Sequence, residues 1–384
     1  MSFITRYWIV LFFFANICAH SALLRFAANP LFFASMGLGV VVIVGNLLNI
    51  VRHNILTKAK FCTLFAVFIL LYQVFFGFSL IHAKSWTYFF SKITVCLAIA
   101  ISVWSNYAYY KTIFLKILSI TIALLLVYGA IRYPGSAGSR VVFGLGNANT
   151  VGCLAAICFG IVLITDLFQK KYRLLLLFVS MGSLLLSGSR CAMGAAVVAF
   201  IIKYGFRTKL VLALMMAYLI ATIALPMLGV RGVGMERFTR SVAELNISEG
   251  RDIERKATIL MIEEAPISGH GLYAGQSKAA RQISELGSHC GFLDILKMMG
   301  IPIGGALIVL MFWQIAGLYF KFRKSHDSVC QAHLFIVVSV FLSTFFEGFI
   351  WGINEPPNTF LFISAVVLQL TSVKLHESQK IRLS

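Results

Sequence analysis

Long apolar runs recur from one end of this 384-residue chain to the other. A helix needs about 20 mostly apolar residues to cross a bilayer. The sequence predicts 12 such spans, at 7–24, 31–51, 61–81, 91–109, 112–131, 147–164, 174–189, 191–202, 211–228, 301–320, 333–350 and 359–373. Charged residues make up only 12% of the chain, whereas soluble domains carry about a quarter. We therefore expect an all-α polytopic membrane protein that forms a single integral membrane domain over residues 1–384.

The seventh and eighth spans come from one apolar tract, 174–206. At a rise of about 1.5 Å per residue this tract is too long for one span and short for two. Ser187, Gly188, Ser189 and Arg190 interrupt it. The pattern favours a tight helical hairpin with Arg190 at its tip.

The Lys and Arg residues are distributed unevenly between alternate segments. With the N-terminus inside, 18 of them fall in inner segments and six in short outer segments, namely Arg25, Lys84, Lys92, Arg132, Arg140 and Arg190. Basic residues accumulate on the cytoplasmic side of membrane proteins. The bias predicts an even number of spans with both termini on the cytoplasmic side. It also accounts for the net charge of +19, so we do not expect nucleic acid as a partner.

The one long polar segment, 230–300, then lies outside, as a large helical loop between spans 9 and 10. It holds nine of the 14 acidic and nine of the 33 basic residues, so its net charge is zero. The apolar positions 235, 238, 242 and 245 predict a helix lying on the membrane or on the spans. A second helix is predicted from Arg251 to Ala265, a turn at Gly269–Gly271, and a third helix from about His289 into the next span.

Arginines are the candidate anion-binding residues. Arg190 offers a rigid fork that binds phosphate oxygens in pairs, although an arginine at a hairpin end can also simply reach toward water. Arg251 follows a glycine at a helix start, where free backbone N–H groups favour an anion. Glu249, Asp252 and Glu254 could pair with it instead. The same anion-binding role is open to Arg255, Lys256, Lys278 and Arg281.

His289 is the candidate general base, because it is among the few groups in the outer segment that can take a proton at neutral pH. His270, between two glycines, competes with it but is more typical of a turn residue. Glu347 could pair with a cation of the site or orient His289, and Asn147 with Asn149 predicts a helix N-cap at the start of the sixth span. The eight cysteines are scattered without C-x-x-C pairs, so no metal is expected.

Four groups of residues resemble one family in their order along the chain. They are Gly146, Asn147, Asn149 and Gly152; Ser187 to Arg190; Gly250 and Arg251 with Pro266, Gly269 and Gly271; and Ser288 and His289 with Leu293 and Gly300. Over residues 141–306 the chain resembles the bacterial O-antigen ligase and O-antigen or capsule polymerase superfamily. It departs from the family pattern at Cys290, where Asn is common, at Arg255, where an aromatic residue is common, and at 300–304, where the glycine spacing is longer.

The resemblance implies a GT-C-like membrane glycosyltransferase. Such an enzyme takes a glycan from an undecaprenyl diphosphate carrier at the outer face of the inner membrane and passes it to an acceptor, without a cofactor or a required metal. Carried over by position, Arg190 and Arg251 would hold the diphosphate and His289 would be the base on the acceptor hydroxyl. The chemistry agrees with these residues, since a diphosphate already leaves well and mainly needs its developing charge neutralised.

The acceptor separates two forms of this activity. The Asn-x-Asn pattern at 147–149 and the segment 346–348 resemble polymerases more, which predicts a carrier-linked glycan as acceptor and a chain-length regulator protein as a candidate partner. The alternative is a ligase that uses lipid A core. A lipid or solute transporter or flippase is the alternative of another class, against which charges are almost absent from the middle of the spans. A purely structural membrane subunit is the third.

Overall fold

The structure is a computed structural model that describes residues 2–21, 24–77, 83–133, 142–145, 147–205, 251–272, 289–350, 352 and 355–383. All regular structure in these residues is helical. The helices are α1 (Ser2–His20), α2 (Arg25–Val44), α3 (Leu47–Arg52), α4 (Ile55–Lys58), α5 (Lys60–Tyr72), the π-helical turn η1 (Gln73–Gly77), α6 (Ala83–Ser105), the π-helical turn η2 (Tyr109–Ile113), α7 (Phe114–Arg132), α8 (Ala148–Ile164), α9 (Lys170–Ser187), α10 (Arg190–Tyr204), α14 (Arg251–Glu264), α16 (Gly291–Phe322), α17 (Ser328–Ser343) and α18 (Pro356–Leu383).

The helices confirm the predicted polytopic membrane protein. Seven helices among the described residues are long and apolar enough to cross a membrane, and α8 and α17 are shorter apolar helices. Every predicted span except 211–228 overlaps a described helix, although α9 and α10 are not among the seven candidate spans. That span and the predicted loop helix over 235–245 lie outside the described residues.

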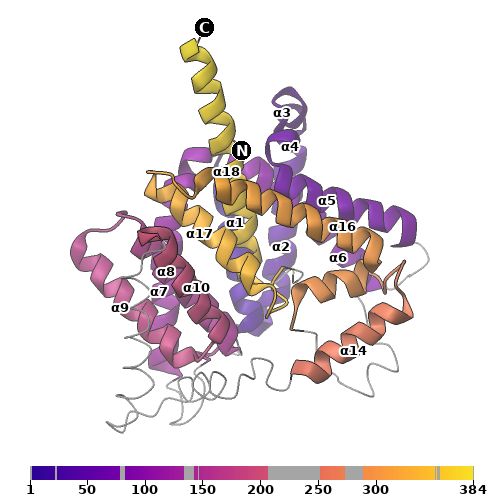
Figure 1. Ribbon diagram of the computed structural model, residues 1–384, viewed down its shortest axis with the longest axis horizontal. Helices are drawn as coiled ribbons and strands as arrows, with labels where there is room; N and C mark the ends of the chain where they lie inside the picture. Colours follow the sequence, from indigo (N-terminus) through magenta and orange to yellow (C-terminus); the bar gives the residue numbers. More distant parts are fainter. Residues whose placement is uncertain are drawn as a thin grey trace.

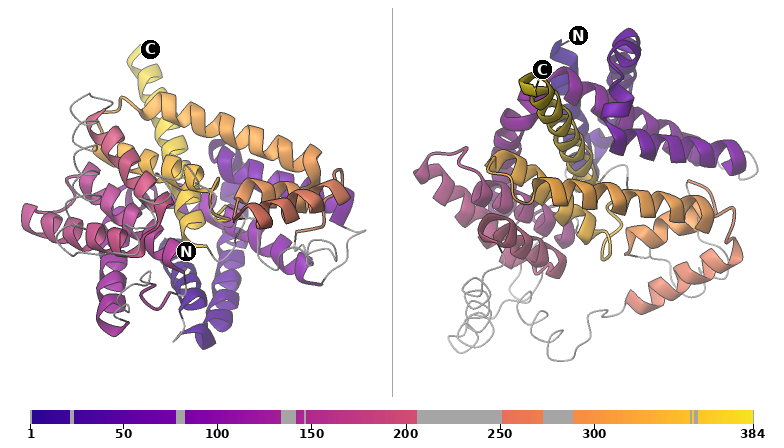
Figure 2. Two further views of the ribbon diagram at one scale, coloured as in Figure 1. Left: turned by 60° about the horizontal axis from the view of Figure 1, so that its bottom comes forward. Right: turned by 45° about the horizontal axis from the view of Figure 1, so that its top comes forward.

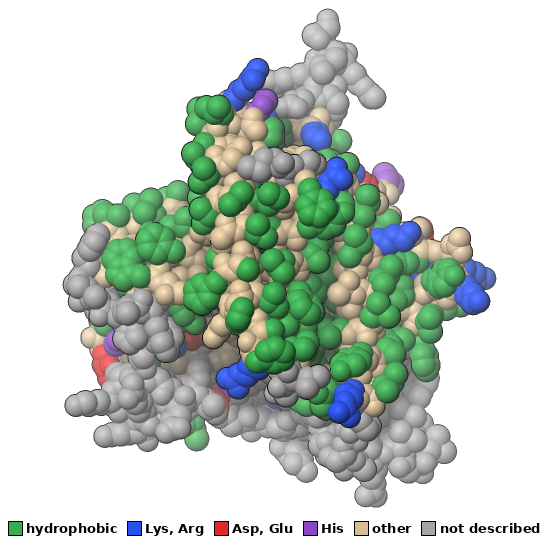
Figure 3. Space-filling model, turned by 180° about the vertical axis from the view of Figure 1, so that it is seen from behind, with side chains coloured by type: hydrophobic (Ala, Val, Ile, Leu, Met, Phe, Trp, Pro, Cys, Tyr) green, Lys and Arg blue, Asp and Glu red, His purple; other side chains and the backbone are tan. Residues whose placement is uncertain are grey.

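The helices do not run parallel to one another. In Figures 1 and 2, α5 and α16 run across the molecule, whereas α1, α2 and α18 run up it. Helices α8, α9 and α10 lie together at one side, beside α7 and α17 (Figure 1). Figure 3 shows a broad hydrophobic surface whose Lys and Arg side chains lie mostly toward its margins. Large apolar side chains such as Phe26 and Trp313 are about four-fifths exposed, at 81% and 78%, which suits a surface in contact with lipid.

Two predicted spans have different boundaries in the structure. The span predicted at 31–51 is wrong in its second half, because α2 ends before Gly45 and Asn46, and α3 is a separate short helix. The span predicted at 333–350 is shifted, because Asp327 caps α17 at its start through the backbone N–H groups of Val329 and Cys330. Helix α17 ends at Ser343, so the segment that holds Glu347 is a non-helical turn after the helix rather than part of it.

Polar contacts join helix ends in two sets. In the first set, Arg6 Nε donates to Asn106 Oδ1 (2.9 Å), and Lys111 Nζ lies 2.7 Å from Asp327. In the second, Tyr72 donates from its hydroxyl to the carbonyl of Ser268 (2.8 Å), and Asn149 binds Glu347. The sequence places Arg6 and Lys111 in inner segments and Ser268 in the long outer segment. The second set defines the end of the molecule where the candidate residues lie.

Candidate functional site

The turn between α9 and α10 carries Arg190. Helix α9 ends at Gly188, which adopts a left-handed conformation (φ 57°), and Ser189 caps α10 by accepting a hydrogen bond from the backbone of Ala192. Arg190 is therefore the first residue of α10 and is half-buried. The predicted tight turn is confirmed, but α9 and α10 pack mainly on α8 and little on each other.

Helix α8 supports this turn through a close backbone approach. A Cβ atom on Gly152 would lie 2.6 Å from Ser189 Cβ and 2.7 Å from Ser187 Oγ, so only glycine allows the first turns of α8 to lie against Arg190's turn. Asn147 caps α8, and its side chain accepts a hydrogen bond from the backbone of Asn149. The predicted N-cap is confirmed.

Glu347 is fixed by the same helix. Its side chain is 5% exposed, and its Oε1 accepts a hydrogen bond of 2.7 Å from Asn149 Nδ2. Its other carboxylate oxygen, Oε2, lies 3.9 Å from His289 Nδ1. Glu347 therefore faces His289. The sequence allowed either this arrangement or a pairing of Glu347 with a cation of the site.

The backbone around His289 is unusual. His289 has a positive φ of 49°, a conformation that costs a residue with a side chain about 1 to 3 kcal/mol and persists where the surroundings enforce it. Two residues later, the Gly291 N–H donates to the carbonyls of Thr344 (2.8 Å) and Glu347 (3.3 Å). A Cβ atom on Gly291 would lie 2.6 Å from Thr344 Cγ2. The close contact at Gly291 holds His289 against the turn that bears Glu347.

Helix α14 approaches His289 from the other side. Glu254 is buried, and its Oε1 lies 4.0 Å from His289 Nε2. The next residue, Arg255, is half-buried, and its Nε has no hydrogen-bond partner in the described part of the chain. Arg251 is the first residue of α14, but its side chain and the whole of Arg281 lie outside the described residues. The imidazole of His289 thus lies between two carboxylates.

The turn after α14 closes against the start of α16. The helix ends at Glu264 before Pro266, as predicted. Gly269 and Gly300 both have positive φ, and a Cβ on either would collide with the backbone of the other segment. The predicted helix from about His289 therefore begins at Gly291 and breaks at Gly300, where the span starts. Figures 1 and 2 show α14 beside this first part of α16.

His270 belongs to this turn. Its backbone N–H donates to the carbonyl of Lys297 (3.0 Å), and its Nε2 lies 2.7 Å from the carbonyl oxygen of Met261. Since a carbonyl can only accept, Nε2 carries the proton. These contacts join the turn to α14 and α16, which agrees with a turn residue rather than with a competing base.

The end of helix α17 contacts both the turn that carries Arg190 and the loop that carries His289. Cys191 Sγ lies 3.9 Å from the carbonyl oxygen of Ser343, and Gly291 bonds to the adjacent Thr344. The turn of Arg190 and the loop of His289 therefore contact consecutive residues at the end of α17. Asn149 adds the first turn of α8 to the same place.

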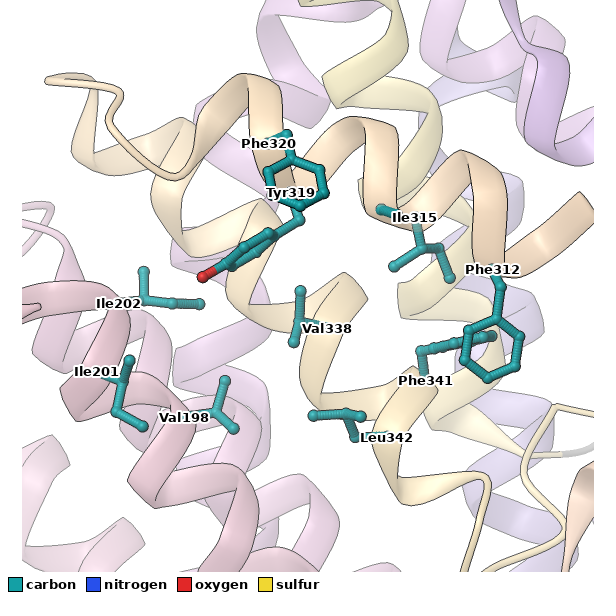
Figure 4. A pocket seen from close by; sticks show the side chains of 11 residues that line it. Val198, Ile201, Ile202, Phe312, Ile315, Tyr319, Phe320, Val338, Phe341 and Leu342 are labelled. Carbon is teal, nitrogen blue, oxygen red and sulfur yellow. The ribbon is translucent and has the colours of Figure 1, made fainter. Parts of the chain in front are cut away.

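An apolar groove of about 440 Å³ leads away from this end of α17. It lies between α10, α16 and α17, and Figure 4 shows aliphatic and aromatic side chains around it, with the Tyr319 hydroxyl as the one oxygen drawn. Leu342, at one end of the groove, is next to Ser343 in the chain. One lining residue of the groove therefore adjoins, in the chain, the residue that contacts the turn of Arg190.

The sequence reasoning missed two members of the cluster. Glu254 was considered only as an ion-pair partner for Arg251, although its spacing with Ala257 and Met261 places all three on one helix face. Asn149 was assigned to the helix cap, whereas its side chain fixes Glu347. Within the described residues, no group of three or more His, Cys, Asp or Glu side chains has the arrangement of a metal site.

Comparisons with known proteins bear on this cluster. Residues 174–310 match the family described as O-antigen ligase, whereas a comparison with curated proteins finds no match. The matched segment contains Arg190, Arg251, Glu254 and His289. Asn149 and Glu347 lie outside it and reach the cluster only through the fold. This match over about a third of the chain supports an assignment to the superfamily of O-antigen ligases and O-antigen polymerases.

Proposed function

We propose that the protein transfers a glycan from undecaprenyl diphosphate to the hydroxyl of an acceptor sugar at the outer face of the bacterial inner membrane, as a polymerase of O-antigen or another surface polysaccharide. The observation that carries this proposal is the position of His289 between Glu347 and Glu254, against the same helix end as the turn of Arg190. A base beside cationic helix starts is what this transfer requires.

In the proposed reaction the acceptor oxygen forms a bond to the anomeric carbon of the donor glycan. The bond from that carbon to the diphosphate breaks, and its electron pair leaves with the diphosphate. The proton of the acceptor hydroxyl passes to His289. Glu347, fixed by Asn149, orients the imidazole and balances its positive charge, as a carboxylate does for a catalytic histidine in other enzymes.

Arg190 and Arg251 are the proposed diphosphate ligands. Each is the first residue of a helix, where backbone N–H groups and the helix dipole favour an anion. A guanidinium adds two parallel hydrogen bonds to phosphate oxygens. Arg255, one turn after Arg251, has a buried Nε that lacks a partner among the described residues, so it is a further candidate.

The apolar groove supports a polyprenyl carrier. An isoprenoid chain is wholly apolar, and the lining between α10, α16 and α17 is nearly so. Its lining residue Leu342 is next in the chain to Ser343, which contacts the turn of Arg190. On α10 the lining begins at Val198, about 12 Å along the helix from Arg190. A carrier with its diphosphate at Arg190 would therefore place isoprene units beyond the first in the groove.

A ligase that transfers the glycan to lipid A core is the second candidate, because the matched family is described as O-antigen ligase. A deletion strain separates the two. Loss of a polymerase leaves a single repeat unit on lipid A core, whereas loss of a ligase leaves bare core and accumulated carrier-linked polymer.

The direct test measures glycan transfer by purified Arg190→Ala, Arg251→Ala and His289→Ala variants. Lys324→Ala is the matched control, because Lys324 is an exposed cation that follows the far end of α16. We expect the three site variants to lose transfer and the control to keep it. Full transfer by all three folded site variants would refute the proposal. Transport of labelled carrier lipid that survives His289→Ala would favour a flippase instead.

A further inference from the structure

Glu254 has a carboxylate oxygen without a hydrogen-bond partner. The residue is 8% exposed, and Oε2 is buried with no partner in the part of the chain that the structure describes. A buried oxygen of a charged group is costly to leave unsatisfied. The other oxygen, Oε1, faces His289 Nε2 at 4.0 Å. The carboxylate therefore has acceptor capacity that no described group uses, and Oε1 presents it toward His289.

The distance between Glu254 and His289 leaves room for a polar group. At 4.0 Å the two atoms are too far apart for a direct hydrogen bond, whose donor–acceptor distance is at most about 3.2 Å. A separation of this kind fits hydroxyl groups inserted beside the two acceptors. His289 keeps 34% of its side chain exposed, so its ring remains accessible to such a ligand.

The negative charge of Glu254 argues against the donor as that ligand. A carboxylate repels a diphosphate, whereas it accepts hydrogen bonds from neutral hydroxyl groups. A reacting hydroxyl has one proton, which it must give to His289. A hydrogen bond to Glu254 therefore has to come from a second hydroxyl. Neighbouring hydroxyls of a sugar ring are about one hydrogen-bond length apart, which suits two acceptors at 4.0 Å.

We propose that Glu254 and the Nε2 edge of His289 form the acceptor subsite, and that the acceptor sugar presents two adjacent hydroxyls to them. The reacting hydroxyl donates to His289 Nε2, and its neighbour donates to Glu254. This assignment rests on the proposed function. It makes Glu254 a residue that binds the acceptor and not the donor.

The test compares two products of one reaction. Full-length protein receives the polyprenyl diphosphate-linked repeat unit isolated from a strain that lacks this gene, with and without lipid A core from the same strain. Transfer to a sugar acceptor and release of free glycan by water are measured together. We expect Glu254→Gln to lower the ratio of transfer to release by about 10- to 100-fold, the loss for one hydrogen bond to a charged group.

Two variants serve as comparisons. Glu263→Gln is the matched control, since Glu263 is an exposed glutamate on the same helix, and it should leave the ratio unchanged. Glu254→Asp keeps the charge and should lower the ratio less than Glu254→Gln does. It also keeps the test open if the Gln variant fails to fold.

The outcomes separate the two proposals. An unchanged ratio of transfer to release in Glu254→Gln overturns the acceptor subsite. This includes the case in which transfer and release fall equally, because Glu254 would then act through His289. Either result leaves the proposed function intact. If the wild-type protein glycosylates neither acceptor, the proposed function is refuted and the subsite with it.

Discussion

Glu347→Gln removes one negative charge beside His289 and almost nothing else. Gln has nearly the same shape, and its amide oxygen can still accept the hydrogen bond that Asn149 donates to Glu347. The lost interaction is the attraction between the carboxylate and the imidazolium that forms when His289 takes the acceptor proton. The nearest atoms of this pair are 3.9 Å apart.

The size of the effect follows from that distance. Two unit charges 3.9 Å apart attract by about 4 kcal/mol at an effective dielectric constant of about 20. Water screens part of this attraction, because the His289 side chain is 34% exposed. We expect the variant to lose about 2 to 4 kcal/mol of transition-state stabilisation, which is roughly a 30- to 1000-fold fall in kcat.

The assay is glycan transfer by the purified variant at saturating donor, alongside thermal unfolding followed with a thiol-reactive dye. Such a dye suits this protein, since seven of its eight cysteines are buried and all are free. The melting temperature should stay close to that of the wild type. If Glu347→Gln keeps a kcat within about threefold of the wild type while His289→Ala is inactive, the argument from charge is refuted.

Four further substitutions test other parts of the structure. Gly291→Ala should lower the free energy of unfolding by about 1 to 3 kcal/mol and reduce transfer, because its Cβ would lie 2.6 Å from Thr344 Cγ2. Arg190→Lys should keep the fold but raise the donor KM by about tenfold or more, because Lys lacks the fork that binds phosphate in pairs. Asp327→Ala should cost about 1 kcal/mol of stability, since Asp327 caps α17. Glu355→Gln should raise the melting temperature near neutral pH. Burial raises the pKa of Glu355, the charge of His20 lowers that pKa, and the Glu347 carboxylate raises it further. A carboxyl group whose pKa is raised on folding stabilises the folded state below its ordinary pKa, and this contribution is lost as the pH rises through the raised pKa. The advantage of the Gln variant should therefore shrink as the pH falls from neutral toward the ordinary pKa of a glutamate.

A specific outcome would contradict each of these four predictions. A wild-type melting temperature in Gly291→Ala or Asp327→Ala would contradict the packing or the cap. Equal donor KM values for Arg190→Lys and the wild type would contradict paired phosphate binding. A melting-temperature difference that does not change with pH would contradict the role of Glu355.

Much of the fold follows from local patterns that the sequence states directly. A span needs a long apolar run, and such runs can be recognised in the sequence without knowledge of the tertiary contacts. Helix α14 ends at Glu264 because Pro266 follows, and α8 begins at Ala148 because the side chain of Asn147 caps the helix. The boundaries of α2 and α17 were less well predicted. Gly45 and Asp327 decide them, and in an apolar tract a single such residue is a weak signal.

The candidate site, like the fold, is only partly determined by the sequence. By itself the sequence determined a polytopic membrane protein, and its resemblance to this superfamily identified Arg190, Arg251 and His289 as candidate residues, since those lie in motifs of fixed order. Only the tertiary structure decided that Glu347 and Glu254 face the two nitrogens of His289, and that Asn149 holds Glu347. Glu347 and Asn149 are 198 positions apart. No local pattern connects residues so distant, because their meeting depends on how α8 packs against the end of α17.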